Sequence, residues 1–252
     1  MTRLGASYRT AAAILRPPMM LLTKRDWRGA ENLPRDGGFV ACSNHISHFD
    51  PLTFAHFLHD NGRPPRFLAK EAVFRIPVLG RIVAGAGQIP VQRESSDAGS
   101  AFAAAVAAVR RGECVAIYPE ATITRDPQMW PMVGKTGAAR IALATGCPVI
   151  PIAQWGQQEI LAPYAKRLHL LPRRTVHVCA GPPVDLSAFV GGPADSAAVH
   201  AATDTILDAI AALLEQIRAE TRPAQRWDPR QHGQPVIGNP NRPPDTSPEG
   251  RR

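Results

Sequence analysis

The chain of 252 residues is 44% hydrophobic and carries a formal net charge of +8, with an isoelectric point near 9.9. This length suits one domain with a substantial core, and no stretch reaches the ~20 apolar residues of a transmembrane helix. The four cysteines form no Cys-x-x-Cys pair, which favours buried reduced thiols over a disulfide framework or a zinc site. The charge favours an anionic partner. Because aromatic residues are few and no nucleic-acid-binding motif is present, we predict an anionic membrane surface and no nucleic acid.

Residues 1–28 are predicted to form an N-terminal membrane-associated segment. Apolar patches here are flanked by arginine, lysine and Trp27, a composition typical of segments that lie in the lipid headgroup zone. Arg16 and the Pro17-Pro18 pair interrupt the apolar run, and no small-residue cleavage site follows, so the segment is not typical of a signal peptide. An ordinary helix packed on the domain is the alternative.

The middle of the chain alternates short apolar runs with helical patterns. The expected strands cover Phe39–Ser43, Phe67–Ala69, Gln88–Val91, Cys114–Tyr118, Val149–Ala153 and Val176–Ala180. The expected helices cover Pro51–His59, Pro77–Ala84, Asp97–Arg110 and Thr136–Thr145, the last of which ends at Gly146. This alternation predicts a single α/β domain over residues 29–221, with a central mixed, largely parallel sheet flanked by helices.

The C-terminal third contains one long helix and a change of composition. An apolar stripe at helical spacing predicts a helix from about residue 195 to 220, docked on the sheet. Residues 222–252 contain seven prolines, several charges and almost no apolar side chains. Such a segment buries too little surface to offset its ordering entropy, so we predict a disordered, Pro-rich basic tail.

The motif His45-Ile46-Ser47-His48-Phe49-Asp50 carries the strongest chemical signal. It follows an apolar strand and precedes a helix that begins near Pro51, where proline is favourable. The strand would deliver His45 to the sheet edge, and the turn would let Asp50 fold back to the imidazole. A carboxylate on one ring nitrogen fixes the tautomer and leaves the other nitrogen to act as a general base.

Further blocks follow this motif in a fixed order. They are Phe67-Leu68-Ala69-Lys70-Glu71, Gly87-Gln88-Ile89-Pro90-Val91-Gln92-Arg93, Tyr118-Pro119-Glu120-Ala121-Thr122 and Val149-Ile150-Pro151-Ile152. Over roughly residues 29–180 the chain resembles the glycerolipid acyltransferases, the family of the 1-acylglycerol-3-phosphate acyltransferases. The resemblance implies that His45 and Asp50 are the catalytic pair, and that Lys70 and Arg93 bear on the acceptor phosphate, as a point charge and a bidentate fork.

The block at Glu120 departs from the family pattern Phe-Pro-Glu-Gly-Thr-Arg. Glu120 and Thr122 are retained as candidate substrate contacts, whereas Ala121 replaces glycine and Ile123 replaces arginine. The loss of that arginine removes a phosphate ligand. Either Arg125 or Lys135 supplies the charge instead, or the acceptor has a different head group.

Three other kinds of site are disfavoured by spacing. His45, His48 and Asp50 lack the His-x-His-x-Asp-His pattern of metallo-β-lactamase-type hydrolases, so we predict no metal. Gly134-Lys135-Thr136 lacks the glycine that a nucleotide-binding loop needs five residues earlier, where Met129 stands. No Gly-x-Ser-x-Gly nucleophile is present, which favours direct transfer without a covalent acyl-enzyme.

The resemblance implies a reaction and a location. A fatty acyl group would pass from acyl-CoA or acyl-carrier protein, as co-substrate and without a cofactor, to the hydroxyl of the lysophospholipid 1-acyl-sn-glycerol-3-phosphate, giving phosphatidate. The protein would lie peripherally on the cytoplasmic face of the cell membrane. The alternatives are another acceptor (glycerol-3-phosphate, another lysophospholipid or a glycolipid) and a non-catalytic basic membrane-binding protein.

Overall fold

The computed structural model describes residues 5–77, 79–91, 98–190, 196–236 and 238–240, and its centre is a seven-stranded sheet. The sheet order is β1-β7-β6-β2-β5-β3-β4. Only the β6–β7 pair is antiparallel, so the prediction of a mixed, largely parallel sheet is confirmed. The strands are β1 (Thr23–Arg28), β2 (Phe39–Ser43), β3 (Pro65–Lys70), β4 (Ile89–Val91), β5 (Cys114–Ile117), β6 (Val149–Trp155) and β7 (Arg174–Ala180).

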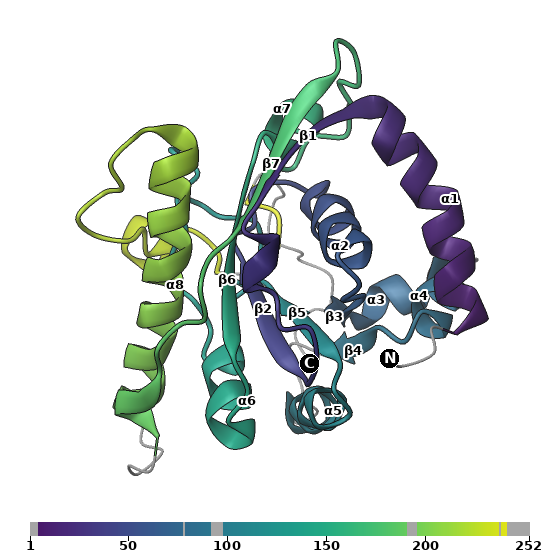
Figure 1. Cartoon of the computed structure of the whole chain (residues 1–252). Helices are drawn as coiled ribbons and strands as arrows, with labels where there is room; N and C mark the ends of the chain where they lie inside the picture. The colour runs from purple at the N-terminus through teal and green to yellow at the C-terminus, as the bar shows by residue number, and fades with distance from the viewer. Residues whose placement is uncertain (1–4, 78, 92–97, 191–195, 237, 241–252) are drawn as a thin grey trace, which may run out of the picture.

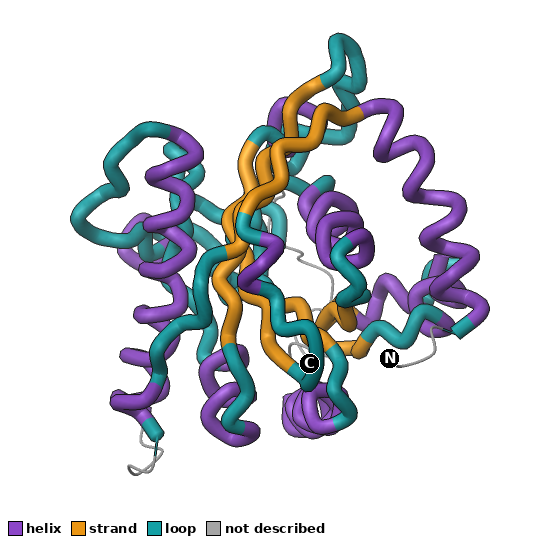
Figure 2. Tube along the Cα trace, viewed as in Figure 1, coloured by secondary structure: helices purple, strands orange, loops and turns teal. Residues whose placement is uncertain are grey.

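Helices cover both faces of this sheet (Figures 1 and 2). One face packs on α2, and the other packs on α5, α6 and α8. The helices are α1 (Ala6–Leu22), α2 (Asp50–Asp60), α3 (Glu71–Phe74), α4 (Leu79–Gly85), α5 (Ala98–Arg110), α6 (Gly137–Thr145), α7 (Gln157–Ile160) and α8 (Ser196–Arg218), with 3-10 turns η1 (Ala30–Asn32), η2 (Ser187–Phe189) and η3 (Pro229–His232).

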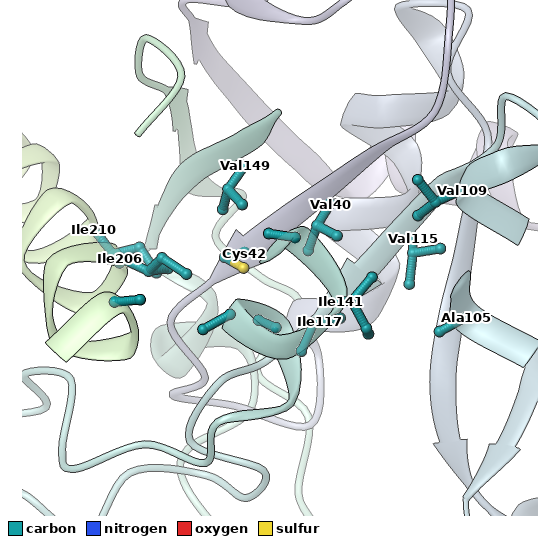
Figure 3. Close-up of a cluster of buried hydrophobic side chains, with 14 of the residues drawn as sticks. Val40, Cys42, Ala105, Val109, Val115, Ile117, Ile141, Val149, Ile206 and Ile210 are labelled. Atoms are coloured by element: carbon teal, nitrogen blue, oxygen red, sulfur yellow. The ribbon is translucent and has the colours of Figure 1, made fainter. Parts of the chain in front are cut away.

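Alternate residues of the central strands fill two separate cores. Val40 and Cys42 of β2 point to the α5/α6/α8 side, where Figure 3 shows them among Val115, Ile141 and Ile206. Phe39 and Ala41 point to the opposite side, against Phe54 and Phe57 of α2. Because both faces are covered, the strands appear in the sequence as continuous apolar runs.

Helix α8 is the one described helix that is long and apolar enough to cross a membrane by length and composition. Its stripe of Val199, Ile206 and Ile210 is buried in the α5/α6/α8-side core. Half of its most apolar window is buried within the protein, as expected for a core helix docked on a sheet.

Strand β1 corrects the predicted boundary at residue 28. Residues Thr23–Arg28 pair in parallel with β7, so they belong to the sheet and not to an N-terminal segment. The strand has no apolar alternation because it lies at the sheet edge, where charged residues are tolerated and discourage further pairing. Hydrophobic periodicity therefore could not reveal it.

Helix α1 runs through the Pro17-Pro18 pair, which interrupts the apolar run of the sequence but not the helix. Tyr8 and Met19 turn inward, and Met19 joins a small core with Phe49 and Ile160. Ile14 and Leu21 lie on the opposite side and are 61% and 71% exposed. The helix is thus packed on the domain along one side and presents apolar side chains on the other.

The prediction of disorder from residue 222 is wrong for residues 222–236 and 238–240. Arg226 forms ion pairs with Asp204 and Asp208 of α8 at 2.8 and 2.5 Å, and Trp227 stacks on His232 at 3.5 Å. Ion pairs and ring stacking anchor this segment where apolar burial is scarce. Residues 241–252 of the predicted tail lie outside the described residues.

Candidate active site

The candidate site lies at the carboxyl end of β2, between the ends of β5 and β6. The connection from β2 to β3 runs through α2 on one face of the sheet, whereas the connection from β5 to β6 runs through α6 on the other. Where the connections that leave adjacent strands run to opposite faces of the sheet, the strand ends border a crevice, which is the usual ligand position in open α/β sheets. The segment from His45 to Asp50 begins in this place.

His45 and Asp50 are paired as the sequence predicts. The imidazole Nδ1 lies 2.9 Å from Asp50 Oδ2. The same oxygen accepts hydrogen bonds from the backbone N–H groups of Ile46 and Ser47 at 2.6 and 2.8 Å. Asp50 is fully buried, while the His45 side chain remains 14% exposed. Within the described part of the chain, no group hydrogen-bonds His45 Nε2, so that nitrogen is available to a substrate.

A buried polar network holds this turn against β6. The Asn44 side chain exchanges two hydrogen bonds with the backbone of Gln154, at 2.9 and 2.8 Å, which extends the β2–β6 ladder beyond the end of β2. The Gln154 side chain bonds the hydroxyls of Ser43 and Thr53 at 3.0 and 2.7 Å. All four side chains are buried. Sequence reasoning assigned none of them a role, because Gln154 lies 110 residues from Asn44.

Glu120 ties the loop after β5 to the histidine motif. Its Oε1 accepts the backbone N–H of His45 and its Oε2 that of Met132, each at 3.0 Å. The residue is 2% exposed, and burial raises the pKa of its carboxyl group to about 8. Because both oxygens are engaged by the backbone, Glu120 acts here as an internal brace between two loops.

The altered positions of the Glu120 block have distinct structural consequences. Tyr118 stacks on His45, with ring centroids 4.2 Å apart. Ala121 has φ +60°, a left-handed backbone that favours glycine, so the replacement of glycine introduces strain. Ile123 is 1% exposed and buried, so the position of the family's arginine carries no charge and faces no solvent.

Thr122 and Arg125 meet at Tyr164, which comes from the connection between α7 and β7. The Tyr164 hydroxyl lies 3.5 Å from Thr122 Oγ1 and accepts a hydrogen bond from the Arg125 guanidinium. Arg125 also donates to the backbone carbonyls of Pro235 and Gly238, and it is 6% exposed. Burial lowers the pKa of Arg125. The guanidinium therefore has neutral partners and lies under the C-terminal segment.

Lys135 lies apart from the His45 pair. It is exposed and borders a cavity of about 240 Å³ that Glu120, His200 and Arg230 also line. His45 is not among the lining residues of this cavity. The predicted substrate contacts thus divide into the loop next to His45, with Glu120, Thr122 and Arg125, and this neighbouring cavity.

The other predicted contacts are only partly located. Lys70 is the last residue of β3 and lies opposite Val91 of β4. Arg93 lies outside the described residues, so its role stays a prediction. Among the residues that the structure describes, no group of three His, Cys, Asp or Glu side chains is arranged to hold a metal ion.

Comparison with known proteins places this geometry in context. The family model described as acyltransferase matches residues 24–155. The chloroplastic 1-acyl-sn-glycerol-3-phosphate acyltransferase of Brassica napus is 34% identical over 140 residues, which cover 55% of this chain and 39% of that protein. The 1-acyl-sn-glycerol-3-phosphate acyltransferase of Borreliella burgdorferi is 28% identical over 159 residues, covering 63% of this chain and 60% of the relative. The matched part thus spans between two fifths and three fifths of these relatives.

A solved structure shares the fold. The 1-acyl-sn-glycerophosphate acyltransferase of Thermotoga maritima superimposes with a TM-score of 0.65 at 21% identity, covering 86% of this chain and 81% of that chain. The matched region of the family model runs from the start of β1 to the end of β6 and includes His45, Asp50 and Glu120. The fold and the sequence comparison therefore agree on the same part of the molecule.

Proposed function

Because this chain belongs to the acyltransferase family, we propose that it transfers a fatty acyl group from the thioester of acyl-CoA or acyl-carrier protein to the hydroxyl of 1-acyl-sn-glycerol-3-phosphate. The product would be phosphatidate. Relatives that carry the name of this activity support the choice of acceptor. The donor carrier is proposed from the chemistry, since a thioester is already activated for attack by a hydroxyl.

The pairing of His45 with Asp50 is the observation that carries this proposal. With its Nδ1–H donated to Asp50 at 2.9 Å, the imidazole presents an unprotonated Nε2 toward the site. Nε2 takes the proton of the acceptor hydroxyl as the hydroxyl oxygen bonds to the thioester carbon. The C–S bond then breaks, and the imidazolium returns the proton to the departing thiolate. Asp50 stabilises the imidazolium between these two steps.

The surrounding residues are proposed to position this base. Glu120 accepts the backbone N–H of His45, and the Tyr118 ring packs on the imidazole, so the side chain has little freedom to rotate. A base held in a productive geometry lowers the entropic part of the barrier. We assign Glu120 and Tyr118 positioning roles, since neither needs to contact the reacting atoms.

The acceptor phosphate is proposed to bind cationic side chains beside this base. Lys70 ends β3 near the same edge of the sheet, and Lys135 is exposed at the neighbouring cavity. Arg125 is a weaker candidate, because its guanidinium would have to leave the carbonyls of Pro235 and Gly238. Arg93 and Thr122 remain proposed contacts by resemblance to the family.

One observation favours a second candidate, an acyltransferase with a different acceptor head group. Ile123 is buried at the position where the family carries arginine, so this cation is replaced by an apolar contact. Glycerol-3-phosphate, another lysophospholipid or a glycolipid would then be the acceptor. An acceptor panel at constant donor concentration separates the two, because only the correct acceptor accelerates thiol release.

The membrane location is proposed from charge and from exposed apolar residues. The chain carries a net charge of +8, and the outer side of α1 exposes Ile14 and Leu21. A peripheral position on the anionic cytoplasmic surface would bring the enzyme to a lipid acceptor. A non-catalytic membrane-binding protein is the remaining alternative, and it would bind vesicles without releasing thiol from any donor.

Thiol release from palmitoyl-CoA, with and without 1-acyl-sn-glycerol-3-phosphate, tests the proposal. His45→Ala should lower the acceptor-dependent rate by about 10²–10⁴-fold, the usual contribution of general base catalysis. His177→Ala is the matched control, because His177 also pairs with an aspartate, at 2.8 Å, but lies on β7 and pairs with a residue of the edge strand β1. A His45→Ala protein that is folded and retains the wild-type rate would exclude the mechanism.

A further inference from the structure

The connection between α7 and β7, residues 161–173, combines exposed leucines with cations. Leu168 and Leu171 are 50% and 79% exposed. Lys166, Arg167 and Arg173 are exposed beside them, and the connection contains no aspartate or glutamate. Large apolar side chains in water are unfavourable unless a partner covers them, and the adjoining cations select an anionic partner.

Residues near both ends of this connection pack against the domain. Leu161 and Leu170 pack against the small core of Met19, Phe49 and Ile160. The backbone N–H of His169 also bonds the carbonyl of Ile160 at 2.7 Å, which closes the loop. Two leucines of the loop are thereby used to fix it to the domain, and the other two are left to solvent.

The loop lies beside the C-terminal end of α1. The Arg173 guanidinium donates to the backbone carbonyls of Met20 and Thr23 at 3.2 and 2.8 Å. Figures 1 and 2 show the loop and this end of α1 together at one extremity of the molecule. Leu21, which is 71% exposed, and the exposed Lys24 are the chain neighbours of the two residues that Arg173 contacts.

The same loop contacts the segment that carries His45. The Ser47 hydroxyl donates to the carbonyl of Leu161 at 2.6 Å, and the His48 ring meets the Tyr164 ring edge-on at 5.9 Å. Tyr164 in turn reaches Thr122. A partner that binds the tip of the loop would therefore bind an element that contacts the segment carrying His45.

We propose that loop 161–173 is a membrane-binding loop, which inserts Leu168 and Leu171 into an anionic phospholipid bilayer while Lys166 and Arg167 contact the lipid phosphates. The proposal rests on the proposed function, because a membrane contact next to the segment that carries His45 serves an enzyme whose acceptor is a lipid. Leucines flanked by lysine and arginine suit the boundary between acyl chains and headgroups. Together with Leu21 the loop forms a second membrane contact, separate from the middle of α1.

Vesicle co-sedimentation of the full chain tests the loop directly. The vesicles contain either phosphatidylcholine alone or phosphatidylcholine with phosphatidylglycerol. Leu168→Ser/Leu171→Ser should lower the partition coefficient at least about tenfold on both kinds of vesicle, because apolar burial is lost. Lys166→Glu/Arg167→Glu should lower binding about tenfold or more on the anionic vesicles and have little effect on the neutral ones.

Val190→Ser is the matched control. Val190 is 65% exposed, but it follows β7 at the end of the strand opposite Arg173. The Val190→Ser variant should bind vesicles as the wild type does. The changed side chains in both loop variants are exposed, so unaltered circular dichroism and melting temperature are expected, and either double variant decides the question if the other misfolds.

Two results would overturn the proposal that this loop binds the membrane. One is vesicle binding of both double variants equal to that of the wild type, which would assign membrane contact to other surfaces. The other is unchanged vesicle binding with loss of turnover only when acyl-carrier protein is the donor, which would make the loop a docking site for that acidic protein. Vesicle binding is measured without turnover, so an absence of acyl transfer would refute the proposed function and leave this test valid. With a short-chain, monomeric acceptor the leucine variant should turn over at the wild-type rate.

Discussion

Among the histidine–aspartate pairs of the described residues, His45–Asp50 and His177–Asp26 have nearly equal distances between the paired atoms, but their surroundings differ. His45 and Asp50 are 2.9 Å apart at the carboxyl end of the buried strand β2, and His177 and Asp26 are 2.8 Å apart between β7 and the edge strand β1. Asp50 is fully buried and has two backbone N–H groups as its other partners. Asp26 is 28% exposed and is shared with Arg28, which holds the pKa of that carboxyl group below its usual value.

A short distance between a histidine and an aspartate is therefore not enough to define a catalytic pair. The carboxylate of the edge pair is shared with the Arg28 guanidinium and is partly exposed, so solvent screens its interaction with the histidine. The carboxylate of the inner pair has no competing side-chain cation in the described residues. Ring stacking on Tyr118 and the hydrogen bond from the His45 backbone N–H to Glu120 also hold this histidine, whose side chain remains 14% exposed.

The largest effect is expected from replacing the two aspartates in turn. Asp50→Asn should lower the acyl-transfer rate by about 10²–10⁴-fold, because an amide cannot stabilise the imidazolium or fix its tautomer. Asp26→Asn should leave the rate unchanged. Steady-state thiol release on both purified proteins measures this difference, and equal effects of the two variants would break the distinction between the pairs.

The next effect concerns the pH dependence of stability that Glu120 introduces. Burial raises the pKa of its carboxyl group to about 8 in the folded protein, above the ~4.3 of an unfolded chain. Between these values the folded state holds a proton that the unfolded state has released, so stability falls as pH rises. The decrease is fully developed only above about pH 8.

The variant Glu120→Gln has no titrating group at this position, so its comparison with the wild type measures the contribution of Glu120 to the pH dependence of stability. At pH 5 the variant should be less stable than the wild type by about 1–3 kcal/mol, because the amide nitrogen cannot accept the second backbone N–H, whereas the hydroxyl oxygen of the protonated acid still can. As pH rises to 8, the difference in the free energy of unfolding should become smaller, since only the wild type loses stability as Glu120 ionises. Denaturant unfolding of both proteins at several pH values measures this difference. A constant difference would show that Glu120 does not titrate in this range.

A smaller effect is expected at Ala121, where φ is +60°. Ala121→Gly should raise the free energy of unfolding by about 0.5–1 kcal/mol, because relief of the left-handed strain exceeds the added backbone entropy. Ala107→Gly in the exposed part of α5 is the control and should destabilise by a similar amount. Destabilisation by both substitutions would indicate that Ala121 is unstrained.

The smallest effect is expected at the edge pair itself. Removing His177 should cost at most about 1 kcal/mol, and less in high salt, because both partners are partly exposed and screened. Thermal melting of His177→Ala at low and high ionic strength measures this contribution. A larger, salt-independent loss would mean that the edge pair is as tightly coupled to the fold as the inner pair.

The patterns that repeat locally were sufficient to predict most of the core. The apolar runs at Phe39–Ser43 and Val149–Ala153 are strands, and the stripe beginning near Val199 is the core helix α8. These signals survive in a single sequence because both faces of a covered sheet, and one face of a docked helix, must be apolar. The edge strand at Thr23–Arg28 and the anchored segment after Arg222 lack such a signal, because exposed edges and ion pairs do not require apolar residues.

For the site, the sequence predicted the pair of His45 and Asp50, because the two residues lie five positions apart in a turn that follows a buried strand. The packing of the whole domain then fixed what surrounds the pair. It placed Asn44 against Gln154, moved Lys135 to a separate cavity, and covered Arg125 with Tyr164 and the C-terminal segment. These contacts join residues far apart in the chain, and only packing of the whole domain decides which distant backbone groups meet.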